Sequence, residues 1–419
     1  MGQSPKESKA NSTRRKLVLG AAGATAAAAT PSFWINIARA QAGPVKIGFP
    51  VPLTGPFGTE AQDQVRCAEI AVKEFNESGG LNGRMAELLV RDDKLNPGEA
   101  ATRTLELIEK EKVNFVVGSL SAAVQLSVNN VCKERGIIYN SISQSDAINE
   151  VKDFSKYTFH EALNPHMTSS AVARYAIPKF GKRVAFLVPD YAFGHEMLRG
   201  FQRAGKEFGM ETLADIRFPL GTSDYSSFFP RVQALKPDIL CMINFGRDQL
   251  NGIKQAYEFG IKQQTRIITP VLLISARMGA GAEAYEGVVG ASSYYWKIED
   301  SVASAKAFND RYRKAHPGGV PTDYGALGYG GVRTVLAAAR NAKTTDTEKV
   351  IAALQNLKSD FYKGPQYYRY CDHQSVQSMI LLQSKAANQV KDKNDVFDII
   401  GIDTPSETVL RSCQELGHK

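Results

Sequence analysis

The sequence predicts an α/β protein made of two Rossmann-like lobes with parallel-rich sheets. From Val45 onward, short β-branched runs alternate with amphipathic stretches, which is the pattern of βαβ units. The same pattern starts again at Arg183, after enough chain to complete one domain. We therefore expect two lobes of similar construction, with a binding cleft between them.

The first lobe is expected to begin with a strand at 45–49, a Gly/Pro loop at 52–58 and a helix that stops at Ser78-Gly79-Gly80. Its further strands are expected at 88–90, 115–117 and 137–139, with helices starting near Pro97 and near Ala122. In the second lobe, strands are expected at 183–188, 239–243, 266–268 and 288–289.

Three stretches interrupt this pattern and are candidates for hinge crossovers between the lobes: 161–165, 291–296 and 367–372. They predict an N-terminal lobe of residues 43–163 and 293–370. They predict a C-terminal lobe of residues 164–292 and 371–419.

Residues 1–42 have the features of a twin-arginine signal peptide. Arg14-Arg15 precede an apolar run from Leu17 to Phe33, and Ala38 to Ala42 offer cleavage after Ala40 or Ala42. We therefore expect a mature protein that is soluble in the periplasm. Cleavage removes six basic residues and one acidic residue, so the formal charge falls from +8 to +3. This small charge gives no reason to expect a nucleic-acid partner.

No pattern in the mature chain predicts catalysis, a metal site or a bound cofactor. It lacks a G-x-S-x-G elbow and a phosphate-binding loop, and the first-strand loop does not have G-x-G-x-x-G spacing. The six histidines are scattered without metal-ligand spacing. The five cysteines are expected to be mostly buried small hydrophobes, and Cys371 with Cys413 is the pair to test for a disulfide.

Candidate binding residues are sought in the loops that follow the strands, because ligands bind at the carboxyl ends of open parallel sheets. The first-strand loop offers Phe57. Small and hydroxyl residues that could hold a carboxylate at a helix start follow at 118–123 and 141–146. The loops at 190–194 and 244–248 supply aromatic and charged groups from the second lobe.

Several motifs, in this order and spacing, resemble the branched-chain amino-acid-binding type of periplasmic receptor, which has the type I periplasmic binding-protein fold. They are I-G-F-P-V-P-L-T-G-P-F-G at 47–58, N-E-S-G-G-L-N-G at 76–83, Asp92-Asp93 before Pro97, V-G-S at 117–119, D-Y-A-F-G at 190–194, Asp224-Tyr225 with Phe228, and D-H-Q at 372–374. The resemblance covers the whole mature chain.

This resemblance implies a receptor whose N-terminal lobe grips a ligand carboxylate before the second lobe closes over it. The grip would fall on Ser121, Ala122, Ser143 and Ser145, and the residues around the rest of the solute would be Phe57, Tyr191, Phe245 and Gly246. An acidic residue that meets a ligand ammonium in the amino-acid binders is replaced by Val271, and a serine of the grip by Ala122.

Two ligand classes are compatible with these differences. One is a branched-chain or related amino acid, with Asp190 or Asp248 as the substitute acid. The other is a carboxylate or amide without an ammonium, aromatic or aliphatic, with Arg247 as a possible counter-ion. Val271 favours the second class, because an ammonium buried without an anion is strongly disfavoured.

As an ABC-importer receptor, the protein would be a monomer or weak dimer that delivers its solute to permease and ATPase subunits at the inner membrane. Two alternatives stay open: a ligand-sensing subunit for a membrane signalling protein, and an exported Rossmann-type enzyme.

Overall fold

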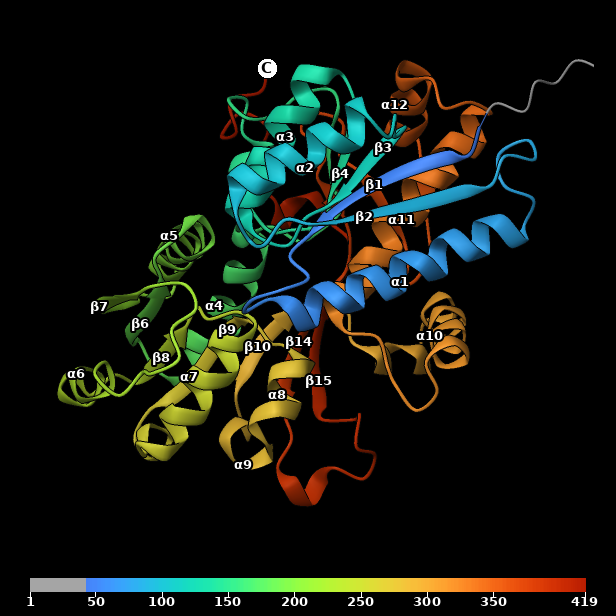
Figure 1. The fold of residues 1–419 in the computed structure, drawn as a ribbon. Coiled ribbons are helices and arrows are strands. Elements are labelled where there is room, and N and C mark those ends of the chain that lie inside the picture. The colour runs from blue at the N-terminus through green and yellow to red at the C-terminus, as the bar shows by residue number, and fades with distance from the viewer. Residues whose placement is uncertain (1–42) are drawn as a thin grey trace, which may run out of the picture. The chain divides into compact units, whose positions relative to one another are not determined.

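Two large β-sheets organise the chain in the computed structural model, which describes residues 43–419 (Figure 1). The predicted signal peptide, residues 1–42, lies outside the described residues. The α/β class with parallel-rich sheets is confirmed.

The first sheet has the strand order β2-β1-β3-β4-β5, and all of its strands are parallel. Helices α1 and α11 cover one face, and α2 and α3 cover the other (Figure 1). Successive side chains of a strand point to opposite faces, so Val117 joins the core under α1 and α11 while Val116 joins the core under α2 and α3. The bounds are β1 Val45–Val51, β2 Ala86–Asp92, β3 Phe115–Gly118, β4 Ile138–Ser141, β5 Thr158–His160, α1 Gly58–Glu77, α2 Pro97–Glu109, α3 Ala122–Arg135 and α11 Asp323–Ala342.

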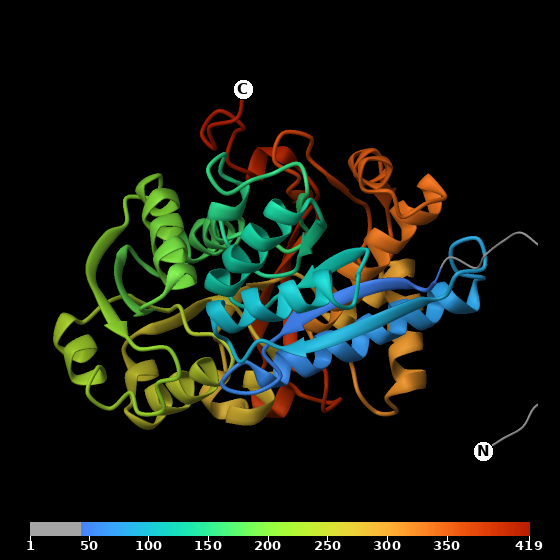
Figure 2. The same ribbon diagram turned by 45° about the horizontal axis from the view of Figure 1, so that its top comes forward.

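The second sheet has the order β15-β14-β10-β9-β8-β6-β7. Its strands from β7 to β10 are parallel, while β14 and β15 are added antiparallel at one edge. In Figure 2, α4 and α5 lie on one side of this sheet and α6 and α7 on the other. The bounds are β6 Arg183–Pro189, β7 Glu211–Phe218, β8 Ile239–Met242, β9 Arg266–Val271, β10 Val289–Ser292, β14 Met379–Ser384, β15 Phe397–Asp403, α4 Pro165–Phe180, α5 Ala192–Lys206, α6 Phe229–Leu235, α7 Arg247–Glu258, α8 Ile274–Ala280 and α9 Ala282–Tyr285.

The remaining elements lie along the returning part of the chain. Helix α10 (Ala303–Ala315) contacts α1, and α12 (Thr347–Gln355) contacts α11. A small antiparallel sheet follows, with strands β11 Lys358–Ser359, β12 Gln366–Tyr368 and β13 Ser375–Val376.

The chain passes between the two large sheets three times. It does so between β5 and α4, after β10, and between β13 and β14. The first two passages fall within the predicted crossovers at 161–165 and 291–296. The third was predicted at 367–372 but comes later, because those residues form β12 and its turn to β13. The lobe boundaries themselves stay a prediction.

A buried polar network joins the three passages. Lys363 Nζ donates to Ser293 O at 3.1 Å and to the Gln377 side chain, and Gln377 Nε2 donates to Glu161 O at 2.5 Å. Gln366 Nε2 and Tyr368 OH each donate to the Glu161 carboxylate at 2.6 Å. The three passages are therefore held side by side by hydrogen bonds, as a common hinge would require.

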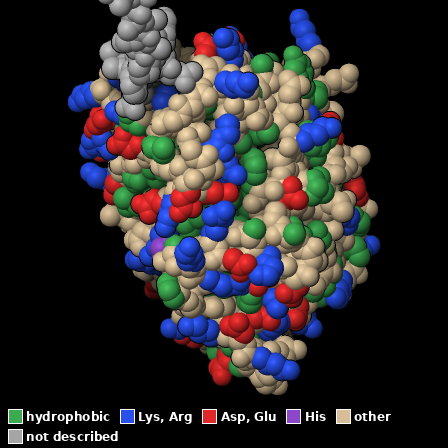
Figure 3. Space-filling model, turned by 90° about the vertical axis from the view of Figure 1, so that its right-hand side faces the viewer, with side chains coloured by type: hydrophobic (Ala, Val, Ile, Leu, Met, Phe, Trp, Pro, Cys, Tyr) green, Lys and Arg blue, Asp and Glu red, His purple; other side chains and the backbone are tan. Residues whose placement is uncertain are grey.

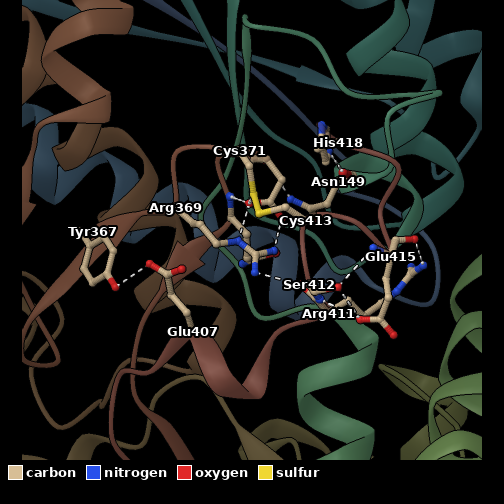
Figure 4. Close-up of a disulfide and its surroundings, with 12 residues drawn as sticks. Asn149, Tyr367, Arg369, Cys371, Glu407, Arg411, Ser412, Cys413, Glu415 and His418 are labelled. Atoms are coloured by element: carbon tan, nitrogen blue, oxygen red, sulfur yellow. Dashed lines mark hydrogen bonds and ion pairs between the residues drawn. A yellow bond between two sulfur atoms is a disulfide. The ribbon is translucent and has the colours of Figure 1, made fainter.

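The C-terminal tail is tied by a disulfide to the turn between β12 and β13 (Figure 4). Cys371 is bonded to Cys413, which is the pair that the sequence singled out. Val151 N donates to Leu416 O at 2.9 Å, and Arg411 pairs with Glu150 at 2.6 Å. Cys67, Cys132 and Cys241 are buried and free, as expected for small core residues.

Basic and acidic side chains are interspersed over the face drawn in Figure 3, which lies on the side of α10. Ion pairs there include Lys306 with Asp310 within α10 at 2.7 Å, and Arg313 of α10 with Glu299, which precedes the helix, at 2.6 Å. Within residues 43–419, no helix combines the length and apolar character needed to span a membrane.

Candidate functional site

The loop after β1 meets the loop after β8, so residues of both predicted lobes come together at the carboxyl ends of their strands. Arg247 N donates to Pro56 O at 2.9 Å. Gly246 has φ of 59°, and a Cβ at this position would lie 2.6 Å from Pro56 O. Only glycine allows both this backbone conformation and this close approach.

Aromatic rings gather around that contact. Phe57 and Phe245 pack edge to face with ring centroids 4.8 Å apart, and Phe245 packs in the same way against Tyr324, also at 4.8 Å. Phe193 lies 6.3 Å from Phe245 and 5.9 Å from Tyr191. The structure therefore brings together three predicted residues, Phe57, Tyr191 and Phe245, with two others from α5 and α11.

The predicted carboxylate grip is buried on the first-sheet side. Ser121 is the N-cap of α3 but makes no side-chain capping bond, and Ala122 begins the helix, where the first amides have no intrahelical acceptor. Ser143 follows β4, is 1 % exposed, and its Oγ has no hydrogen-bond partner within residues 43–419. Helix-start amides and a hydroxyl are donors of the kind that an oxyanion requires, and their joint role in a grip stays a prediction.

Ser145 has a different environment, because its hydroxyl donates to Glu196 Oε1 at 3.0 Å and accepts from Ala147 N at 3.2 Å. Glu196 Oε2 also accepts from Asp146 N at 2.8 Å, which links α5 to the loop after β4. Burial, and then the charge of Asp146, raises the pKa of Glu196 to about 8. Ser145 thus takes part in a contact between the predicted lobes, and its role as a ligand residue stays a prediction.

The predicted second-lobe residues are spread over different environments. Val271 is buried, and its carbonyl accepts from Gln249 Nε2 at 2.6 Å, while the Arg247 side chain is exposed. Of the two substitute acids, Asp190 is exposed and pairs with His195 and Arg217, and Asp248 is buried and accepts from Gly221 N at 2.9 Å. Neither acid is free of protein partners.

Two other acids, which the sequence analysis did not single out, lie near these aromatic rings. Glu60 on α1 accepts from Ser275 Oγ on α8, but its Oε2 has no partner within the described chain. Both carboxyl oxygens of Asp323, at the start of α11, also lack a partner there. In a sequence, an acid in the first turn of a helix is ordinary because it complements the helix dipole, so nothing marked these two.

Burial raises the pKa of both acids. The pKa of Glu60 rises to about 7 through burial, against the lowering effect of the Ser275 hydrogen bond. The pKa of Asp323 rises to about 8 through burial and then through the charge of Glu60. The backbone amides of Tyr324 and Asp323, and then the Ser292 hydroxyl, lower the Asp323 pKa somewhat, but none of them completes a hydrogen bond of normal geometry with its carboxyl. The Ser292 hydroxyl donates to Tyr294 O instead.

Within residues 43–419, no group of three or more His, Cys, Asp or Glu side chains is arranged to hold a metal ion. The chemistry that the arrangement supports is recognition: donors for an oxyanion on one side, aromatic rings beside them, and unpartnered carboxyls at the start of two helices.

A family model described as periplasmic binding protein matches residues 44–390. Among curated proteins, the Leu/Ile/Val-binding protein homolog 7 of Brucella abortus strain 2308 is 23% identical over 82% of this chain and 90% of its own.

Solved structures are similar over most of their length. A periplasmic binding protein from Burkholderia mallei shares 29% identity and a TM-score of 0.83, over 89% of this chain and 98% of its own. A solute-binding protein of an ABC transporter from Rhodopseudomonas palustris BisB5, solved with 3,4-dihydroxybenzoic acid, shares 22% identity and a TM-score of 0.76, over 86% of this chain and 97% of its own. The expected fold is thereby confirmed.

Proposed function

Since the chain belongs to the periplasmic binding protein family, we propose that it is an exported receptor for a small solute that carries a carboxylate. The solute, an amino acid or an aromatic or aliphatic organic acid, binds between a lobe of residues 43–163 with 293–370 and a lobe of residues 164–292 with 371–419. Closure of the lobes presents the solute to the permease and ATPase subunits of an ABC importer at the inner membrane.

One observation carries this proposal. The hydroxyl of Ser143 is buried and has no partner within residues 43–419, and Ser143 follows β4, the strand that pairs with β3 ahead of α3. The next residue, Gln144, donates to Tyr324, which packs on Phe245, the partner of Phe57. A buried hydroxyl without a partner costs free energy, and a carboxylate would supply the missing acceptor. The rings offer an apolar surface to the rest of the solute.

The nature of the second-lobe side narrows the solute further. Val271 supplies no charge, so a solute with no ammonium beside its carboxylate suits this side better. The Rhodopseudomonas palustris protein was solved with an acid of this kind, 3,4-dihydroxybenzoic acid, which supports the choice.

A thermal-shift screen of residues 43–419 against amino acids, aliphatic acids and aromatic acids tests the proposal. A solute present at ~100 Kd stabilises its receptor by about 2.7 kcal/mol, which is readily measured. We expect at least one carboxylate to raise the melting temperature and its amide to have a smaller effect. A screen in which no carboxylate has an effect would contradict the proposal.

A further inference from the structure

Strand β2 lies at an edge of the first sheet, and its outer side carries backbone groups that β1 does not use (Figure 1). At one end of the strand, Val45 N donates to Met85 O at 2.8 Å. At the other end, Asp93 N donates to Val51 O at 3.2 Å. The backbone groups of a strand point alternately to its two sides. The odd-numbered residues of β2 therefore face β1, and the even-numbered residues face outward.

The outward backbone groups of β2 are only partly satisfied. The Asn76 side chain caps Ala86, since it donates to Ala86 O at 3.0 Å and accepts from Ala86 N at 2.6 Å. Val90 O accepts from Arg91 Nη1 at 3.1 Å. The N–H and C=O of Leu88 and the N–H of Val90 have no partner within residues 43–419. Unpaired edge groups of this kind are a template for pairing with another strand.

The sequence of β2 is complementary to itself when a second copy lies antiparallel with Leu89 opposite Leu89. Leu88 is then opposite Val90 of the partner, and these two outward-facing residues exchange both backbone hydrogen bonds. Glu87 is opposite Arg91 of the partner, in the closer type of pair that lacks backbone hydrogen bonds and favours side-chain contact. Each contact occurs twice, as a two-fold axis between identical chains requires.

The charges on the strand support this pairing. Glu87 is exposed and forms no ion pair within the described chain. Arg91 pairs with two acids of its own chain through Nε and Nη2, while its Nη1 donates to Val90 O. The N–H of the partner's Leu88 would replace Nη1 on Val90 O and release it toward the partner's Glu87. Opposite charges thus meet at both ends of the paired segment.

A groove beside the strand offers room for the partner's side chains. It has a volume of 500 Å³, lies between α1 and β2, and is lined by Val72 and Leu88 together with charged residues of both signs, including Glu69 and Lys73. Leu88 and Val90 point to this side of the sheet, because both pack on the core under α1 and α11. Opposite residues of paired strands share a face, so the partner's Leu88 would lie at this groove.

We propose that the protein forms a homodimer in which the β2 strands of two copies pair antiparallel about Leu89 and join the two first sheets into one. The paired segment is short, so the dimer is weak and depends on protein concentration. The interface contains none of the residues proposed to bind the solute. This inference therefore goes beyond the proposed function and does not depend on it.

Analytical ultracentrifugation of residues 43–419, from about 5 µM to about 500 µM, tests the proposal over the range of weak association. We expect the mass of the native protein to rise from that of one copy toward that of two. Val90→Pro removes an outward N–H but no hydrogen bond to β1, and proline is tolerated at such edge positions. This variant should melt close to the native temperature and stay a monomer.

Charge reversal tests the register of the pairing. E87R and R91E each place like charges opposite one another and should weaken self-association by about tenfold or more. An equimolar mixture of the two variants restores opposite charges at both pairs, so it should form a mixed dimer. E211R is the matched control, because Glu211 is an exposed acid on β7, the edge strand of the second sheet, and this variant should dimerise like the native protein.

Three results would overturn the proposal or its details. A native protein with the mass of one copy at every concentration would overturn it outright. A dimer that is as stable in Val90→Pro and E87R as in the native protein would place the interface elsewhere. A mixture of E87R and R91E that associates no more tightly than either variant alone would overturn the pairing about Leu89.

Discussion

Ser143 places a buried hydroxyl with no partner within residues 43–419 just after β4, the strand that pairs with β3 ahead of α3. If this hydroxyl binds the solute carboxylate, Ser143→Ala should remove a hydrogen bond to a charged group and weaken binding by roughly 10- to 100-fold. The folding stability should hardly change, because no bond within the protein is lost. Titration with the best acid from the screen measures the effect.

Ser127→Ala is the matched control, because Ser127 lies on α3 and its hydroxyl donates to Pro97 O outside the site. Equal affinity in Ser143→Ala and Ser127→Ala would remove Ser143 from the grip.

Glu196 makes the stability depend on pH. Its folded-state pKa of about 8 lies above the ordinary value of 4.5, so the folded state holds this proton more tightly. The contribution to stability is fully present below about pH 4.5 and is lost as the pH rises through about 8. Glu196→Gln should therefore flatten the decline in unfolding free energy between pH 5 and pH 8 by on the order of 1 kcal/mol.

Urea unfolding at several pH values measures this decline, with Glu207→Gln, an exposed position just beyond the same helix, as the control. A decline of the same size in the native protein and in Glu196→Gln would show that this carboxyl does not cause it.

At the scale of elements, the approach of the β1 loop to the β8 loop depends on Gly246. An added Cβ would lie 2.6 Å from Pro56 O and 2.9 Å from the Phe57 ring, so Gly246→Ala should push the loops apart. We expect solute affinity to fall by about tenfold, which corresponds to a packing cost of about 1.4 kcal/mol. Titration of the variant with the best acid from the screen measures this loss.

Gly221→Ala separates this clash from backbone strain, because Gly221 also has a positive φ, 84°, but nothing within 4 Å of an added Cβ. If Gly246→Ala and Gly221→Ala lose affinity equally, the clash between the β1 and β8 loops is not the cause of the loss.

The disulfide acts on the β12–β13 turn and the C-terminal tail. It closes a segment with a sequence separation of 42, so its removal in C371S/C413S should lower the unfolding free energy by about 2–4 kcal/mol. Urea unfolding with and without dithiothreitol measures this effect. Reduction should lower the unfolding free energy of the native protein by the same amount and leave that of the variant unchanged. A native midpoint that reduction does not move would contradict this expectation.

The sequence was sufficient to predict the strands that have a strong periodic pattern, and it was insufficient to predict others. β1, β3, β6 and β8 are buried β-branched runs and were predicted, whereas β7 is mostly exposed and alternates with charges, as edge strands do. β14 and β15 were missed because they join the second sheet antiparallel, far along the chain from its other strands.

For the proposed site, the search of the loops that follow the strands led to Phe57, Ser143 and Phe245, because loops after parallel strands share one edge of a sheet. Of these, Phe57 and Phe245 pack together, and their role in binding stays a proposal. That search could not lead to Glu60 or Asp323. What distinguishes these acids is that three of their four carboxyl oxygens lack a hydrogen-bond partner within residues 43–419, and that depends on packing between α1, α8 and α11 rather than on local sequence.

For the whole molecule, the three passages between the sheets and their shared network of Glu161, Lys363 and Gln377 suit a receptor that moves about one hinge. The proposed recognition groups come from both predicted lobes: Ser143 and Phe57 from one, Phe245 from the other. A solute that contacts both sides would favour the closed arrangement by its differential affinity for it.

The central claim is that this receptor holds its solute by a carboxylate. Calorimetric titration of residues 43–419 with each acid found in the screen, and with the methyl ester of the same acid, tests it most directly. We predict saturable one-to-one binding of the acid and an affinity for the ester lower by about tenfold or more. An ester that binds as tightly as its acid would contradict the claim.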